Sequence, residues 1–98
     1  MDERQLRLLA VIKHIPKGAW MSYGDVARHA GLPGYHRLVV RVLANAPDDS
    51  LPWHRVLRSD GRPGLEPGSA GYRKQLRRLA SEGIEIRGER ACSGRVPA

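Results

Sequence analysis

The chain has 98 residues, which leaves room for one domain with one hydrophobic core. Hydrophobic residues make up 41% of it and charged residues 28%, values that exclude an intrinsically disordered chain, and no apolar run reaches the roughly 20 residues that span a bilayer. A formal net charge of +7, from 17 Lys and Arg against 10 Asp and Glu, should attract a polyanion, most commonly nucleic acid. A basic surface with no such partner is the alternative.

Cysteine usage and the first residues bear on where the protein works. The single cysteine, Cys92, cannot form an internal disulfide, which fits a reducing compartment. The segment after Met1 lacks the basic cluster and apolar run of an export signal. We therefore expect a cytoplasmic protein that does not associate with membranes.

The first two predicted helices are defined by apolar spacing and by capping residues. Over residues 2–15, aliphatic side chains recur at near-helical spacing with charges between them, which predicts an amphipathic helix ending before Pro16. A second helix is predicted over residues 22–30, because Ser22 is a natural N-cap and Asp25 suits the first turn of a helix.

A third helix is predicted over residues 35–45, after a tight turn at residues 31–34. Its aliphatic residues form one stripe, and Arg37 and Arg41 lie on the opposite face. Two short helices joined by about four residues have the outline of a helix-turn-helix, whose second helix enters a DNA groove. An ordinary helical hairpin is the alternative, and the two arginines favour DNA binding.

The second half of the chain is predicted to be less regular. We expect a short strand at residues 55–57, an irregular loop at 58–68, a helix over 69–82 and a short strand at 84–86. The apolar face of that helix should carry Tyr72, Leu76, Leu79 and Ala80. Residues 1–87 would then form one domain, followed by a loose tail at 88–98.

The most informative stretch runs from Leu51 to Val56 and reads Leu-Pro-Trp-His-Arg-Val. With its neighbours, the chain resembles the C-terminal domain of the O6-alkylguanine-DNA alkyltransferases over about residues 5–86. The matching pieces occur at the family's spacing: Ile15-Pro16-Lys17-Gly18, Ser22 to Ala27, Gly31-Leu32-Pro33, Arg37, Asn45, Pro52, His54-Arg55-Val56 and Glu82-Gly83. The resemblance implies a single winged helix-turn-helix-type domain, mainly α with short β segments.

One departure from the family pattern decides the expected function. The repair enzymes have Pro-Cys-His-Arg, whose cysteine accepts the alkyl group, and this chain has Trp53 at that position. An indole has no nucleophilic heteroatom that could accept an alkyl group, since its N–H is only a donor. The Pro-Trp-His-Arg form resembles the alkyltransferase-like proteins, which recognise the lesion and mark it for nucleotide excision repair. Cys92 lies in the expected tail with no nearby histidine, so it is interpreted as an incidental thiol.

The resemblance implies a non-enzymatic sensor that flips O6-alkylguanine out of duplex DNA into a pocket and blocks alkyltransferases by occupying the lesion. The expected partners are double-stranded DNA containing O6-alkylguanine and nucleotide excision repair proteins. We expect a monomer with no catalytic residue, no cofactor and no metal.

Five residues are predicted to contact the DNA or the lesion. The resemblance makes Tyr23 the residue that pushes on the backbone phosphate and Arg37 the finger that refills the base stack. Trp53 would form part of the pocket wall, and Ser22 and Arg41 would be further DNA contacts. A plain phosphate contact for Arg37 and a core position for Trp53 are the alternatives.

Three polar residues match the network that activates the cysteine in the enzymes: Asn45, His54 and Glu82. With no thiol to activate, they are interpreted as a structural polar network, in which His54 and Glu82 should be hydrogen-bonded to each other or to backbone.

Two further departures concern the groove and the pocket rim. Val40 and Arg41 stand where the family has a glycine and small residues, which leaves the depth of groove docking open. Glu66 falls about where the enzymes have a pocket-rim tyrosine, which predicts a more open pocket.

Two rival functions remain. An enzyme using unfamiliar chemistry would need a metal cluster or a nucleophile beside His54, and the sequence shows neither. A helix-turn-helix transcription regulator without lesion specificity would not need the Pro-Trp-His-Arg and Glu-Gly motifs.

Overall fold

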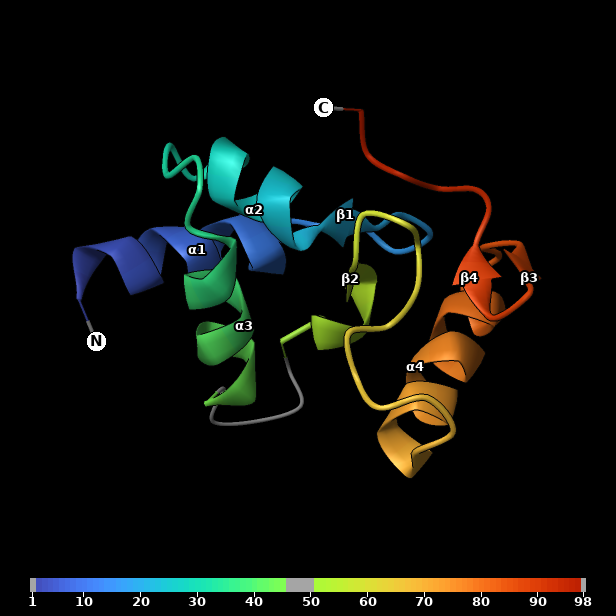
Figure 1. The fold of residues 1–98 in the computed structure, drawn as a ribbon. Coiled ribbons are helices and arrows are strands. Elements are labelled where there is room, and N and C mark those ends of the chain that lie inside the picture. The colour runs from blue at the N-terminus through green and yellow to red at the C-terminus, as the bar shows by residue number, and fades with distance from the viewer. Residues whose placement is uncertain (1, 46–50, 98) are drawn as a thin grey trace.

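Helices dominate the computed structural model, which describes residues 2–45 and 51–97 (Figure 1). Within these residues the elements are α1 (Glu3–Lys13), β1 (Met21–Ser22), α2 (Tyr23–His29), α3 (His36–Ala44), the 3₁₀ turn η1 (Trp53–Arg55), β2 (Val56–Leu57), α4 (Ala70–Ser81), β3 (Ile86–Arg87) and β4 (Arg90–Ala91). The predicted fold class, mainly α with short β segments, is confirmed.

Three of the helices begin at capping side chains. Asp2 accepts a hydrogen bond from the backbone N–H of Gln5, whose own side chain accepts from Asp2 N, so that α1 starts with a complete capping box. Ser22 Oγ accepts from Asp25 N at 3.0 Å to start α2, and Ser69 starts α4 in the same way. The predicted cap Ser22 is confirmed, and the predicted start of the helix at residue 69 coincides with the cap Ser69.

Helices α1, α2 and α3 pack into one layer, at the left of Figure 1, and α2 and α3 form the predicted helix-turn-helix. Its turn contains Gly31 and Gly34, both at positive φ, a conformation that glycine adopts without steric cost. The main core lies between these three helices and is built from residues such as Leu8, Ile12, Val26 and Val39. This layer holds the outer face of α3 towards solvent.

Helix α4 and the β3–β4 hairpin form the other side of the molecule, at the right of Figure 1. A second core cluster there contains Trp20, Leu57, Leu79, Ile84 and Ala91. Strands β1 and β2 pair in parallel between the two sides, with Met21 opposite Val56 and Ser22 opposite Leu57. This short pair joins the helix-turn-helix to the segment that carries the Trp-His-Arg motif.

The prediction of a loose tail from residue 88 is wrong for residues 88–97; Ala98 lies outside the described residues. β4 pairs with β3, and Ala91 N donates to Gly61 O at 2.9 Å. Farther along, the backbone of residues 94–96 hydrogen-bonds to Trp20 on both sides. Backbone pairing in such a short segment produces no apolar periodicity, so the sequence pattern did not indicate it.

Helix α4 differs from expectation on its inner face. Ala80 is exposed, and Gln75 is buried in its place with 2% of its surface exposed. Gln75 Nε2 donates to the backbone oxygens of His54 at 3.1 Å and Val56 at 2.9 Å. The amide satisfies two carbonyls that the irregular η1–β2 segment leaves without strand partners.

A buried carboxylate joins three parts of the chain. Glu82 comes directly after α4, and its side chain, 9% exposed, accepts hydrogen bonds from Arg55 and from the backbone N–H of Gly18. His54 Nε2 lies 2.8 Å from Glu82 Oε2, so the predicted His54–Glu82 hydrogen bond is present. Arg55 also donates to Ile15 O at 2.9 Å, which ties η1 to the end of α1.

The charge state of Glu82 is set by this environment. Burial by itself raises the pKa of the carboxyl, but the hydrogen bonds from Arg55 and His54 outweigh it and lower the pKa from 4.5 to about 2. Because the pKa is lower in the folded chain than in the unfolded chain, the carboxylate stabilises the fold fully above about pH 4.5. That stabilisation is lost as the pH falls from 4.5 towards 2.

We expect Glu82→Gln to lower the free energy of unfolding at pH 7 by about 3 kcal/mol, because Arg55 would lose its buried countercharge. The variant should also lose much of the pH dependence of stability between pH 4.5 and 2. Denaturant unfolding across this pH range measures both effects. Glu85→Gln is the matched control, because the Glu85 side chain is 49% exposed in a surface pair with Arg87. Equal losses in the two variants would contradict the assignment.

Candidate nucleic-acid interface

A small apolar cavity lies between the two sides of the molecule. Its volume is about 170 Å³, well below the roughly 300–1,000 Å³ of pockets for drug-sized ligands. Side chains from α2, α3, η1, the loop at 64–65 and α4 line it: Tyr23, Val40, Leu43, Ala44, Trp53, Val56, Gly64, Leu65 and Gln75. A cavity of this size and largely apolar lining suits one small, mainly apolar ligand.

Trp53 forms part of the cavity wall at the start of η1. Its indole meets the His54 ring edge to face, with the ring centroids 6.1 Å apart and the planes at 84°. The Arg78 guanidinium lies 5.4 Å from the centre of the indole. These two contacts hold a half-buried aromatic plane at the position that resemblance assigns to the acceptor cysteine.

Tyr23 lines the cavity from the first turn of α2. Burial raises the pKa of its phenol, so the hydroxyl is protonated and can donate a hydrogen bond at neutral pH. The loop crosses close above it at Gly64, where a Cβ would collide with the Tyr23 hydroxyl oxygen. Only glycine lets the loop approach the ring this closely.

The polar network predicted from the sequence is present in part. His54 and Glu82 meet, whereas Asn45 ends α3 as an exposed C-cap and shares no hydrogen bond with either of them within residues 2–45 and 51–97. His54 Nε2 faces the Glu82 carboxylate, and the buried Nδ1 of the same ring has no partner among the described residues.

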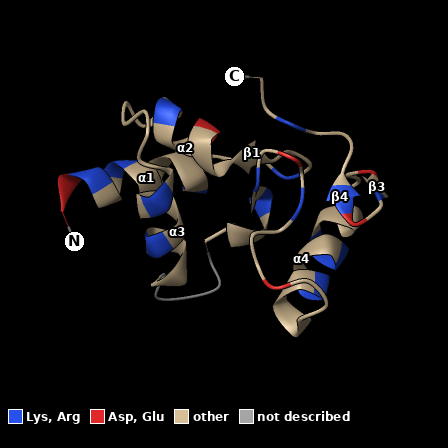
Figure 2. Ribbon diagram, in the orientation of Figure 1, with Lys and Arg blue, Asp and Glu red and all other residues tan. Residues whose placement is uncertain are grey.

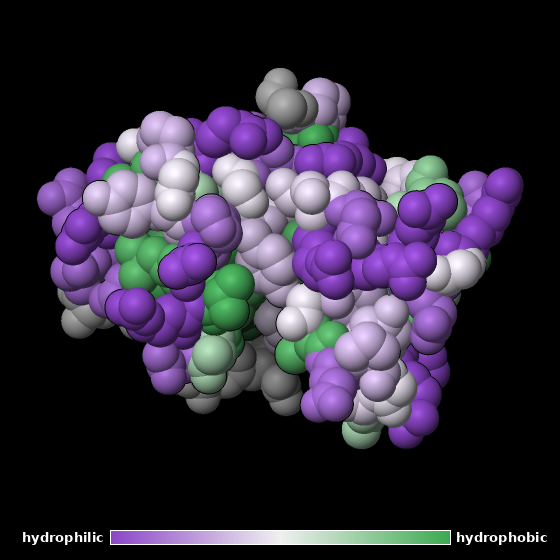
Figure 3. Space-filling view, in the orientation of Figure 1, coloured by the Kyte–Doolittle hydropathy of each residue, from purple (hydrophilic) through white to green (hydrophobic). Residues whose placement is uncertain are grey.

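The outer face of α3 is exposed and basic. Arg37 and Arg41 point to solvent, as expected, and Figure 2 shows the Lys and Arg positions on α3 and α4. Val40 is 49% exposed and also lines the cavity, so it lies at the rim. In Figure 3, apolar surface over α3 is framed by hydrophilic side chains.

Two predicted positions lie away from the cavity. Leu65 lines it, and Glu66 is not among the lining residues. Cys92 is exposed just after β4 and is not among the lining residues. Sequence reasoning also missed Gln75 and Arg78, since a long polar side chain on a basic helix gives no signal that it turns inward.

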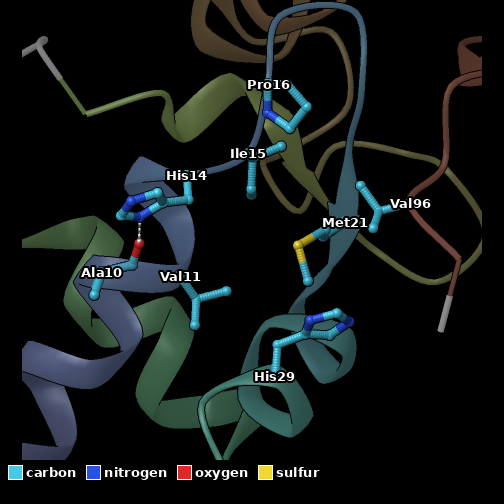
Figure 4. A pocket seen from close by; sticks show the side chains of 8 residues that line it. All are labelled: Ala10, Val11, His14, Ile15, Pro16, Met21, His29 and Val96. Atoms are coloured by element: carbon cyan, nitrogen blue, oxygen red, sulfur yellow. Dashed lines mark hydrogen bonds between the residues drawn. The ribbon is translucent and has the colours of Figure 1, made fainter.

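A larger hollow of about 440 Å³ shares no residue with the cavity. Figure 4 shows its lining side chains, which come from the end of α1, from β1, from α2 and from Val96. His14 lies at this hollow and bonds to Ala10 O at 2.7 Å. The hollow is lined by no arginine or lysine of the described residues, so the smaller cavity beside the basic face of α3 is the better candidate for a DNA base.

Neither a metal-ligand cluster nor a membrane-spanning helix occurs within residues 2–45 and 51–97. No three His, Cys, Asp or Glu side chains come together there as metal ligands. None of the helices in this part of the chain is both long and apolar enough to cross a membrane.

Comparison with known proteins identifies the family. Residues 3–84 match the family described as 6-O-methylguanine DNA methyltransferase, DNA binding domain. The chain is 44% identical over 87 residues to a DNA base-flipping protein of Vibrio parahaemolyticus, covering 88% of this chain and 85% of that protein. It is 38% identical over 87 residues to alkyltransferase-like protein 1 of Schizosaccharomyces pombe, covering 88% and 81%.

Solved structures of related proteins share this fold. The crystal structure of S. pombe Atl1 in complex with damaged DNA containing O6-carboxymethylguanine superimposes with a TM-score of 0.78 at 38% identity, covering 89% of this chain and 82% of that one. Mycobacterium tuberculosis O6-methylguanine methyltransferase superimposes with a TM-score of 0.70 at 29% identity, covering 84% and 49%. The chain belongs to the 6-O-methylguanine DNA methyltransferase DNA-binding-domain family and resembles its base-flipping and alkyltransferase-like members.

Proposed function

We propose that the protein is a non-enzymatic sensor of DNA damage that binds O6-alkylguanine in duplex DNA and holds the flipped base in the Trp53 cavity. The observation that carries the proposal is the chemistry of the cavity wall. Tyr23 is the one ionisable residue among the described lining residues. The raised pKa of its phenol keeps the hydroxyl protonated and weakly nucleophilic at neutral pH. The wall can enclose an alkylated base, but it offers no activated group to accept the alkyl.

Burial of the alkyl group in the cavity does not by itself offset the free-energy cost of flipping the base. Burying one methyl group contributes about 0.8 kcal/mol, whereas flipping a base out of the duplex costs a few kcal/mol. Two further contributions offset the difference: the damaged base pair is easier to open, and a side chain refills the stack. Arg37, exposed in the first turn of α3, is the residue that we assign to the second task.

The relatives support this proposal. The Vibrio protein is named for base flipping, and the S. pombe protein was crystallised with damaged DNA containing O6-carboxymethylguanine. Both resemble this chain over more than four fifths of its length. We infer that this chain likewise binds damaged DNA and that Ser22, Tyr23 and Arg41 contribute further DNA contacts.

Recognition of the lesion would have two consequences in the cytoplasm. A monomer seated on the lesion would exclude an alkyltransferase from the same base and would present a marked site to nucleotide excision repair proteins. A transcription regulator without lesion specificity is the competing function, and the cavity beside the recognition helix α3 argues against it, because reading base edges in a groove needs no cavity.

Binding to one duplex with and without O6-methylguanine tests the function. We expect at least tenfold tighter binding to the lesion whatever the flanking sequence, with both partners chemically unchanged after long incubation. Titration by fluorescence anisotropy gives the affinities, and mass spectrometry of protein and DNA gives the chemistry. A methyl adduct on any residue, or restored guanine, would show an enzyme, and equal affinity for both duplexes would favour the regulator.

The Arg37→Ala variant distinguishes a stacking role of Arg37 from a simple contact with a DNA phosphate. If Arg37 refills the stack, the variant should lose affinity chiefly for lesion DNA, and Arg37→Lys should not restore it, since an ammonium cannot stack as a guanidinium does. A phosphate contact would weaken both duplexes equally and lower the salt slope by about one. Arg73→Ala, on the exposed face of α4, is the matched control, and salt titrations of Kd on both duplexes are the measurement.

A further inference from the structure

We propose a second binding site beside the base cavity, a hollow that holds a DNA phosphodiester between Arg28, Arg58 and Arg95. This inference rests on the proposed function. It assigns a binding site to a phosphate beside the flipped nucleotide, whose base occupies the cavity. The hollow has a volume of about 390 Å³, and its lining includes Ser22, Tyr23 and Asp25 together with the three arginines. The arginines come from α2, from the segment after β2 and from the C-terminal segment.

A buried carboxylate fixes two of the three arginines. The Asp25 side chain is 1% exposed and accepts hydrogen bonds from Arg28 and from Arg95, whose Nη2 lies 3.1 Å away. Burial by itself raises the pKa of Asp25, but the bonds from Arg95 and Ser22 outweigh it and leave the pKa lowered. Asp25 is therefore ionised at neutral pH and holds both guanidinium groups at the edge of the hollow.

Arg95 is held by two more contacts. Its Nη1 donates to Ser59 O at 3.1 Å, and its guanidinium lies 5.1 Å from the centre of the Trp20 ring. The side chain is still 43% exposed. A guanidinium whose position is fixed by the protein loses less entropy when it binds an anion than a free surface arginine does.

The charges at the hollow favour an anion. Three guanidinium groups face one carboxylate, which leaves a net charge of two positive units on the lining arginines and Asp25. Arg58 is 60% exposed, and its pair with Asp60 at 3.2 Å is a surface ion pair of the weak kind. A phosphate can replace such a partner, since arginine forms stronger, bidentate hydrogen bonds with phosphate oxygens.

The position of the hollow identifies the anion. Tyr23 lines the hollow and also lines the apolar cavity, so the two sites adjoin at one residue. A nucleotide likewise joins an apolar, planar base to an anionic phosphate. With the flipped base in the cavity, a phosphate that flanks it would lie in the hollow. His36, next to Arg37 at the start of α3, also lines the hollow, which places it beside the recognition helix.

Neutral phosphates test the proposal. One methylphosphonate at a time replaces each phosphate flanking O6-methylguanine, and Kd is measured for the native protein, Arg58→Ala and Arg28→Ala. Both arginines are more than half exposed, and Asp25 keeps its bond from Arg95 when Arg28 is removed, so the fold should stay intact, which thermal melts verify. Arg87→Ala is the matched control, because Arg87 is an exposed arginine paired with its neighbour Glu85 in the β3–β4 hairpin.

We expect one methylphosphonate position to weaken native binding about tenfold and to have little further effect on Arg58→Ala. The salt slope of Arg58→Ala should fall by about one on damaged DNA, where the base is flipped, and less on normal DNA, while Arg87→Ala keeps the native pattern on both. If the losses from Arg58→Ala and from every methylphosphonate simply multiply, the phosphate site is overturned. The sensor function then still stands provided that native protein prefers the lesion, so the two failures are distinguishable.

Discussion

The geometry of the candidate site depends on the hydrogen bonds and ion pair that the Glu82 carboxylate makes. It lies where α4 ends and accepts hydrogen bonds from Arg55, His54 and the Gly18 backbone, groups separated from it by 27 to 64 positions in the chain. A single charge therefore fixes η1 against α4 and against the segment after α1. Because η1 also carries Trp53, the cavity wall is positioned by the same network that holds the two sides of the molecule together.

This arrangement gives His54 and Glu82 a structural role that does not depend on the residue at position 53. In the enzymes, by resemblance, these polar groups activate a thiol; here Arg55 and His54 share a carboxylate whose lowered pKa contributes to stability at neutral pH. A substitution at Glu82 would leave a buried arginine without its countercharge, whatever the residue at position 53. Selection for folding alone could therefore retain His54, Arg55 and Glu82.

Much of the fold could be predicted because its signals are local. The side chains of Ser22 and Ser69 cap α2 and α4 by accepting a hydrogen bond from the backbone N–H three residues later. The apolar spacing of α1 and α3 indicates which faces of these helices are buried. The site was less predictable. Gln75 turns inward to serve carbonyls of η1 and β2, and Arg95 returns to Asp25 across 70 positions. Such contacts depend on where remote segments lie in space, which a pattern of residue types does not encode.

The two tryptophans occupy environments that make them independent reporters. Trp20 is 3% exposed in the second core cluster and donates from its indole nitrogen to Ser93 O at 2.9 Å, so its emission depends on whether the C-terminal segment is docked. Trp53 is half-buried at the cavity wall, where a stacked base would quench it. The intrinsic fluorescence of the unlabelled protein thus contains separate signals for folding of the chain and for occupancy of the cavity, and replacing either indole by phenylalanine would resolve them.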